Sequence, residues 1–140
     1  MGAEVRWSLF LSVFLFLFLC ITGTASDVTV YWTFATNNVD GTPITDLAGA
    51  KVYYGTASSN YTHVVDAGMG GAEGPGDNGS FTVTGLVFGV RYYLNGTAYN
   101  TCGLESDFCN EVSKVAGAPG KPVRLRIFGV RPIITTDTTP

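Results

Sequence analysis

The chain has 140 residues, enough for one domain of ordinary size; only 14% of them are charged, and 18 are glycine. This composition favours short strands and turns over helices. Residues 27–115 carry a net charge of −6 and residues 116–140 carry +3, which argues against nucleic acid as a partner, since a nucleic-acid binder has its positive charge on the folded domain.

The N-terminal segment has the layout of a secretory signal peptide, which we place at residues 1–26. Arg6 precedes an uncharged run, WSLFLSVFLFLFLCI, and the small residues TGTAS follow it. The run is shorter than the roughly 20 residues that span a bilayer, so we expect cleavage after Ala25 or Ser26, with a retained anchor as the alternative. The mature chain is then extracellular or at the cell surface, and meets the membrane only through the transient leader.

Several segments alternate between apolar and polar residues, a pattern that predicts half-buried β-strands. The first two are VTVYWTF and AKVYYG, and a short third lies in YTHVVDAG. After a glycine-rich loop come SFTVTGL, RYYLNGTAY and NEVSKV. Short alternating strands with turn residues between them predict an antiparallel sandwich.

The stretch TGLVFGVRYYLNGTAYN, residues 84–100, resembles the corner between strands E and F of the fibronectin type III family. Leu86, Gly89 and Tyr92 match the leucine, glycine and tyrosine of that corner, and Trp32 matches the core tryptophan of strand B. The resemblance implies an all-β, immunoglobulin-like antiparallel β-sandwich over residues 27–116, in the variant found in bacterial secreted and surface proteins. It also implies that Tyr92 hydrogen-bonds back to the upstream backbone.

The chain departs from the family pattern in its core and at its start. Ala50 and Gly96 are small residues at core-facing positions of neighbouring strands, so they predict a gap, which Phe34 is a candidate to fill. The family has a strand A before strand B. Cleavage near Ser26 leaves almost nothing in that place, and strand B is then expected to be an exposed sheet edge.

Little in the sequence indicates catalysis or a cofactor. Cys102 and Cys109 predict a disulfide in an oxidising compartment; a metal site is the alternative, but it needs more ligands, and His63 is the one histidine. The sequence contains neither a phosphate-binding loop nor a spaced carboxylate series. We therefore expect no enzyme, cofactor or metal. Asn-x-Ser/Thr sequons occur at Asn60, Asn78 and Asn95, and they matter only in a host that glycosylates.

Three tyrosines form a candidate binding surface. If Tyr92 points inward on its strand, Tyr93 and Tyr99 point outward, and Tyr53 points the same way from the neighbouring strand. Exposed tyrosines suit contacts with proteins or glycans. The alternative is that they are cross-strand pairs which stabilise the sheet.

Residues 117–140 form a basic tail whose first part is strand-like and whose last part is rich in threonine. Val123, Leu125 and Ile127 alternate with two arginines, so they are a candidate donor strand. Because the end of strand G and the start of strand A lie at opposite poles in this family, we expect the tail to reach strand B of a neighbouring molecule more easily than its own. The alternatives are that it folds back, or that it is a weakly ordered remnant.

The sequence as a whole indicates a secreted, non-enzymatic module of an extracellular or cell-surface assembly. In that assembly it either binds a protein or glycan partner or has a structural role. Two alternatives remain open. One is a subunit of a head-to-tail polymer, which self-associates through the donor strand. The other is an accessory module of a secreted carbohydrate-active system.

Overall fold

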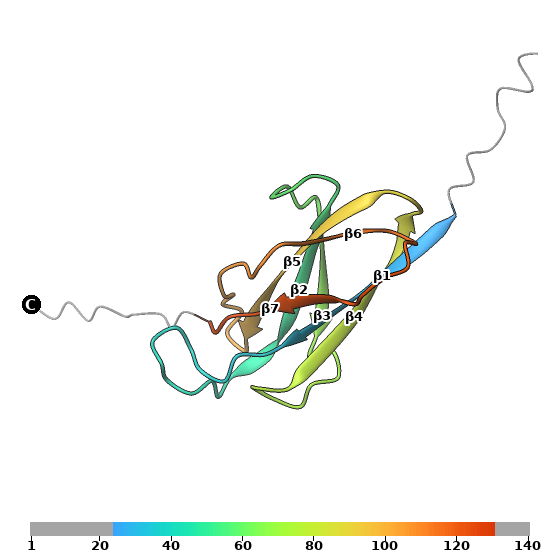
Figure 1. Cartoon of the computed structure of the whole chain (residues 1–140). Helices are drawn as coiled ribbons and strands as arrows, with labels where there is room; N and C mark the ends of the chain where they lie inside the picture. Colours follow the sequence, from blue (N-terminus) through green and yellow to red (C-terminus); the bar gives the residue numbers. More distant parts are fainter. Residues whose placement is uncertain (1–23, 131–140) are drawn as a thin grey trace, which may run out of the picture.

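The computed structural model describes residues 24–130, and it confirms the predicted fold class. The described chain has seven strands and no helix, arranged as an immunoglobulin-like β-sandwich of the fibronectin type III type (Figure 1). The strands are β1 (Ala25–Thr33), β2 (Leu47–Gly55), β3 (His63–Gly68), β4 (Asn78–Val87), β5 (Arg91–Asn100), β6 (Val112–Val115) and β7 (Val123–Arg126). Residues 1–23 of the predicted leader and the threonine-rich end of the tail, residues 131–140, lie outside the described residues; Ala25 and Ser26, where cleavage was expected, begin β1.

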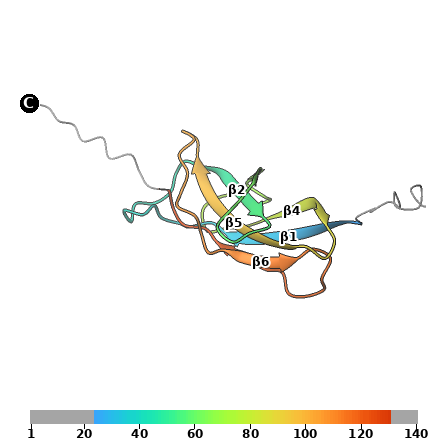
Figure 2. The same cartoon turned by 90° about the horizontal axis from the view of Figure 1, so that it is seen from above.

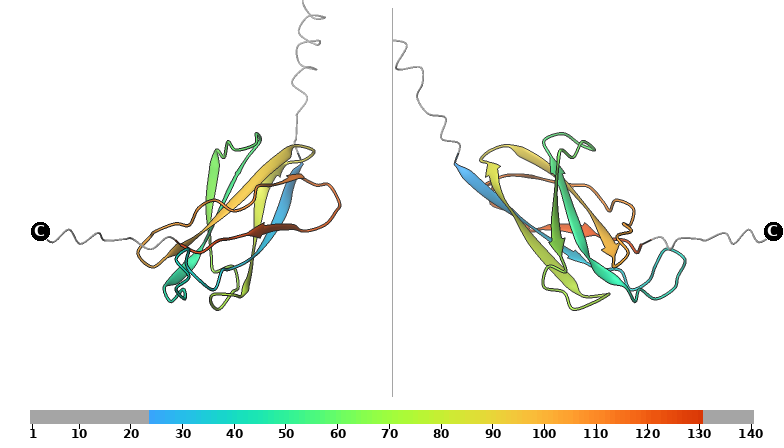
Figure 3. Two further views of the ribbon diagram at one scale, coloured as in Figure 1. Left: turned by 60° about the vertical axis from the view of Figure 1, so that its left-hand side comes forward. Right: turned by 180° about the vertical axis from the view of Figure 1, so that it is seen from behind.

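The strands form two sheets, whose inner faces supply the core. One sheet has the order β4-β1-β7 and the other has the order β3-β2-β5-β6. Every strand pair is antiparallel except β1 with β7, which is parallel. The loop between β1 and β2 lies at the pole where the described chain ends, and β1 begins at the opposite pole (Figures 2 and 3).

The alternation in β1 produces the expected two faces. Val28, Val30 and Trp32 are buried, while Thr29 faces outward and its hydroxyl hydrogen-bonds that of Thr82 on β4 at 2.9 Å. Trp32 pairs with Gly79, where an added Cβ would lie 2.5 Å from the indole ring. Glycine at that position is thus what allows β4 to approach the tryptophan closely.

The corner between β4 and β5 has the predicted geometry. Leu86 and Tyr92 are buried, and Gly89 has a φ of 79°, a left-handed conformation that favours glycine. The backbone N–H of Val87 donates to the Tyr92 hydroxyl oxygen at 3.2 Å. The tyrosine therefore fixes the corner as a hydrogen-bond acceptor.

The C-terminal segment lies beside β1 of the same chain, and this corrects the expectation that it would pair more easily with a neighbouring molecule. Residues Val123 to Arg126 pair in register with Val30 to Thr33. Val123, Leu125 and Ile127 are buried in the chain's own core, with no more than 7% of each residue exposed. The free edge that β1 was expected to have is covered along these four residues by β7.

Chain direction explains why the tail folds back. β6 ends at Val115, which pairs with Arg91 at the start of β5. An added Cβ on Gly117 would lie 3.3 Å from the Ser26 hydroxyl, so the tail passes the beginning of β1 as it leaves β6. From there it runs along β1 in the same direction, which gives the parallel pairing.

β7 also fills the space that the small core residues leave. An added Cβ on Gly96 would lie 3.0 Å from Leu125 Cδ1 and 3.5 Å from Ile127 Cδ1. The side chains nearest to Gly96 thus belong to Leu125 on β7 and to Ile127 just after it, and not to Phe34, the candidate that the sequence suggested. Phe34 is itself buried in the core, edge-on to Trp32 at 6.0 Å between ring centroids.

Candidate functional site

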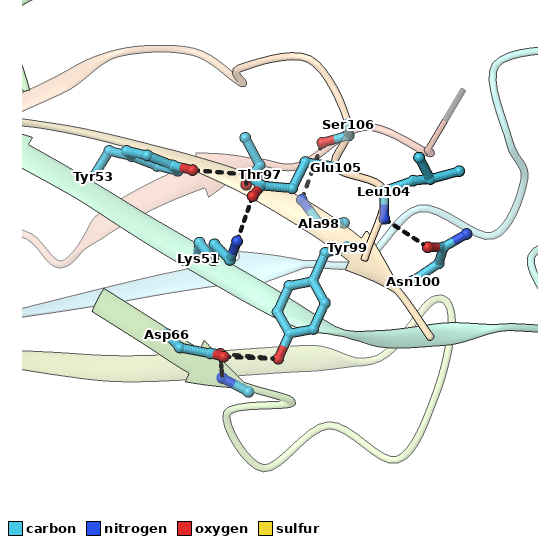
Figure 4. Close-up of polar contacts among 11 residues, drawn as sticks. Lys51, Tyr53, Asp66, Thr97, Ala98, Tyr99, Asn100, Leu104, Glu105 and Ser106 are labelled. Atoms are coloured by element: carbon cyan, nitrogen blue, oxygen red, sulfur yellow. Dashed lines mark hydrogen bonds and ion pairs between the residues drawn. The ribbon is translucent and has the colours of Figure 1, made fainter. Parts of the chain in front are cut away.

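The three tyrosines of the predicted surface lie on β2 and β5, and all three are half-buried. The Tyr53 hydroxyl donates to Glu105 Oε2 at 2.7 Å, and the Tyr99 hydroxyl donates to the Asp66 carboxylate at 2.9 Å (Figure 4). Tyr93 takes part in neither contact. Two of the three hydroxyls already donate to carboxylates of their own chain, one in the loop after β5 and one on β3, so their geometry is that of a stabilising network.

Glu105 is the centre of this network, and sequence reasoning missed it. Its carboxylate accepts hydrogen bonds from Lys51, Tyr53 and Thr97, which lie on two neighbouring strands (Figure 4). Burial alone would raise the pKa of Glu105, but these hydrogen bonds outweigh it and hold that pKa below its ordinary value. Glu105 follows β5 in a loop, so no strand periodicity indicated its position.

A second acidic residue, Glu111, fastens the turn between β2 and β3 in the same way. Its carboxylate accepts from the Ser58 hydroxyl, the Ser59 backbone N–H and the Tyr61 hydroxyl, at 2.6 to 2.7 Å. The Tyr61 hydroxyl also accepts a 3.0 Å hydrogen bond from the side-chain amide of Asn95. Asn95 is only 4% exposed, so its sequon is buried in the folded protein, whereas Asn60 and Asn78 are exposed.

The predicted disulfide between Cys102 and Cys109 is absent from the structure, in which both residues are free thiols. The two side chains have different environments. Cys102 is exposed in the turn after β5, while Cys109 is buried and its thiol donates to Asn95 Oδ1 at 3.2 Å. Burial raises the pKa of the Cys109 thiol, so that side chain behaves as a small buried polar group.

A different surface of the molecule exposes large apolar side chains, at the pole where the described chain ends. Val39, Phe108 and Phe128 are 58%, 49% and 53% exposed. They border a hollow of about 570 Å³, which we call the loop-end hollow; its walls come from residues 35, 37–39, 107–108 and 127–129. No motif pointed to it, because its residues come from three loop or tail segments that the fold brings together.

Phe108 connects the loop-end hollow to the tyrosine network. Its ring packs edge-on against Tyr53 with centroids 4.9 Å apart and lies 5.4 Å from the Tyr61 ring. Tyr53 is in turn held by Glu105, so the exposed phenyl ring rests on a fixed aromatic support. A rigid, half-exposed aromatic side chain suits protein contact because little side-chain entropy is lost on binding.

Residues 24–130 contain neither a cluster of metal ligands nor a membrane-spanning helix. No group of three or more His, Cys, Asp or Glu side chains that could hold a metal ion occurs there. Nor do these residues include a helix long and apolar enough to cross a membrane.

Two curated proteins are similar to this chain over 95 residues. The receptor-type tyrosine-protein phosphatase F of Bos taurus is 34% identical and that of Rattus norvegicus is 33% identical. Each match covers 67% of this chain but only 4% of the length of the other protein. No family model and no solved structure matches the chain. Both similar proteins are mammalian, so the matches lend no support to the bacterial variant expected from the sequence.

Proposed function

We propose that this protein is a non-enzymatic module of the fibronectin type III family that binds a protein partner outside the cell, at a cell surface or in an extracellular assembly. The sandwich with its tyrosine corner supports the family. The similarity to a receptor-type protein supports the cell-surface setting. Because the match covers 4% of that protein, we infer that it corresponds to one module of a long chain.

The loop-end hollow is the observation that carries the proposed binding. Protein interfaces are centred on aromatic and apolar side chains in a partly concave setting, and the loop-end hollow offers two phenyl rings and a valine around such a concavity. The tyrosine face of β2 and β5 is less suitable, since its polar groups satisfy one another.

The environment of Cys109 does not favour a nucleophilic function for its thiol. A cysteine nucleophile reacts as the thiolate, which a positive surrounding favours. Burial instead raises the pKa of Cys109 and so favours the neutral thiol, and the Sγ–H faces two neutral acceptors, the side-chain amide of Asn95 and the backbone carbonyl of Asn110.

A cell-binding assay tests this function. The chain without its predicted leader, labelled with a fluorophore, is titrated onto intact cells of the organism that carries it, and bound fluorescence is measured by flow cytometry. We expect saturable binding that the double variant Phe108→Ser/Phe128→Ser weakens by at least about tenfold, as for the loss of aromatic anchors at an interface.

The matched control is Thr29→Ser/Thr82→Ser, which changes two residues on the outer face of the other sheet. It should bind like the native protein, and Trp32 fluorescence should show that both variants are folded. Equal binding by the native protein and the phenylalanine variant would exclude the loop-end hollow as the binding surface.

A further inference from the structure

The slot beside β1 is filled by a strand that a short connector joins to the rest of the sandwich. Residues 117–122, GAPGKP, connect β6 to β7 and contain two glycines and two prolines. Within this connector, the Ala118 N–H donates to the Val115 carbonyl at 3.1 Å, and the Lys121 carbonyl accepts from Lys114 Nζ at 3.5 Å. At its start the connector packs on Phe88, since an added Cβ on Gly117 would lie 2.3 Å from that ring, whereas residues 119–122 are exposed. Short hinge loops of this kind favour strand exchange between copies.

The contacts of β7 are made almost entirely to the body of the sandwich. It pairs with β1 over four residues, and the side chains of Leu125 on β7 and of Ile127 just after it cover Gly96. On its other edge the Arg126 N–H donates to Asn110 Oδ1 at 2.6 Å, and Asn110 Nδ2 donates to the Arg124 carbonyl at 3.4 Å. A β7 strand from a second copy has the same sequence, so it can form every one of these contacts.

We propose that the slot between β1 and Asn110 binds β7 of a second copy of this chain, so that two molecules exchange these strands reciprocally and form a closed dimer. The connector changes from a turn to an extended segment, a conformation that Pro119 and Pro122 favour for the residues before them. Six extended residues span at most about 20 Å, so the two slots must lie near each other. Reciprocal exchange uses up both strands and both slots, so the assembly closes and does not grow into a fibre.

Exchange requires β7 to leave its own slot first. This step exposes Val123, Leu125 and Ile127, which are buried in the closed monomer. We therefore expect the dimer to form during refolding at high protein concentration, when the slot is filled for the first time. Closed monomers, once mixed, exchange slowly.

Disulfide trapping tests the exchange. Tyr31 and Arg124 are cross-strand partners, and both face outward. In a background with Cys102→Ser and Cys109→Ser, one copy carries Tyr31→Cys and a second, differently tagged copy carries Arg124→Cys. The two are refolded together from urea at several concentrations and then oxidised. We expect a cross-linked heterodimer whose yield rises with concentration.

Two controls make the result decisive. The single chain with both Tyr31→Cys and Arg124→Cys should form the bond internally, which shows that the pair can be bridged. A Thr82→Cys copy replaces the Tyr31→Cys copy in the second control, because Thr82 lies on the opposite side of β1 from β7 and should not cross-link with Arg124→Cys. The proposal is overturned if the single chain forms its internal disulfide but the two copies give no heterodimer at the highest concentration. It is also overturned if the Thr82→Cys copy cross-links equally well, or if the internal disulfide does not form.

Discussion

A double-mutant cycle between β5 and β7 probes the packing that completes the core. Leu125 is 1% exposed, so Leu125→Ala removes a buried side chain and should lower the free energy of unfolding by about 2–5 kcal/mol. In Gly96→Ala, the new Cβ would lie 3.0 Å from Leu125 Cδ1 and 3.3 Å from the Lys51 carbonyl oxygen. Such overpacking should cost about 1–3 kcal/mol.

The two changes should compensate when they are combined. Leu125→Ala removes the atom that the new methyl group meets first, and the methyl group refills part of the cavity. The double variant should therefore lose about 1–2 kcal/mol less than the sum of the single losses. Urea unfolding followed by Trp32 fluorescence measures each value, and Leu86→Ala combined with Gly96→Ala is the additive control. Strict additivity of the Leu125 and Gly96 changes would refute the placement of Leu125 over Gly96.

Three further outcomes follow from the contacts described. Tyr92→Phe should lower the free energy of unfolding in urea by about 1–3 kcal/mol, because the Val87 N–H loses its acceptor. Tyr93→Phe should lower it much less, and equal losses would mean that the corner is wrongly assigned. A thiol reagent should modify exposed Cys102 quickly and Cys109 only on unfolding; no reaction in denaturant without reductant would instead indicate a disulfide. The pKa of Glu105 is lower in the folded state than its ordinary value of 4.5. The native protein should therefore be more stable than Glu105→Gln at any pH above 4.5, and this difference in unfolding free energy should disappear as the pH falls through the folded-state pKa. A stability difference unchanged down to the most acidic pH would contradict that network.

The sandwich was predictable because its signals are local. Alternation in β1 and the three-residue spacing of Leu86, Gly89 and Tyr92 each depend on residues close together in the chain. The outward direction of Tyr53 and Tyr99 followed from the same two-residue period.

The rest depended on contacts between distant segments. Tyr53 meets Glu105 and Tyr99 meets Asp66, and neither acid shows by its own neighbours that it faces a tyrosine. The position of β7 required knowledge of which pole the chain leaves after β6. The loop-end hollow combines Val39, Phe108 and Phe128 from three segments without periodicity.

The central structural claim is that the C-terminal strand completes the sandwich beside its own β1. NMR on the isotope-labelled chain without its predicted leader, at low concentration, tests it through the backbone amides of residues 123–126 and their nuclear Overhauser effects to β1. We predict that the amides of β7 exchange slowly with solvent and that nuclear Overhauser effects connect Tyr31 with Arg124. These effects should persist when the labelled protein is mixed with an excess of unlabelled protein, because they arise within one molecule. Fast-exchanging amides with no contact to β1, or contacts that vanish on that dilution, would contradict it.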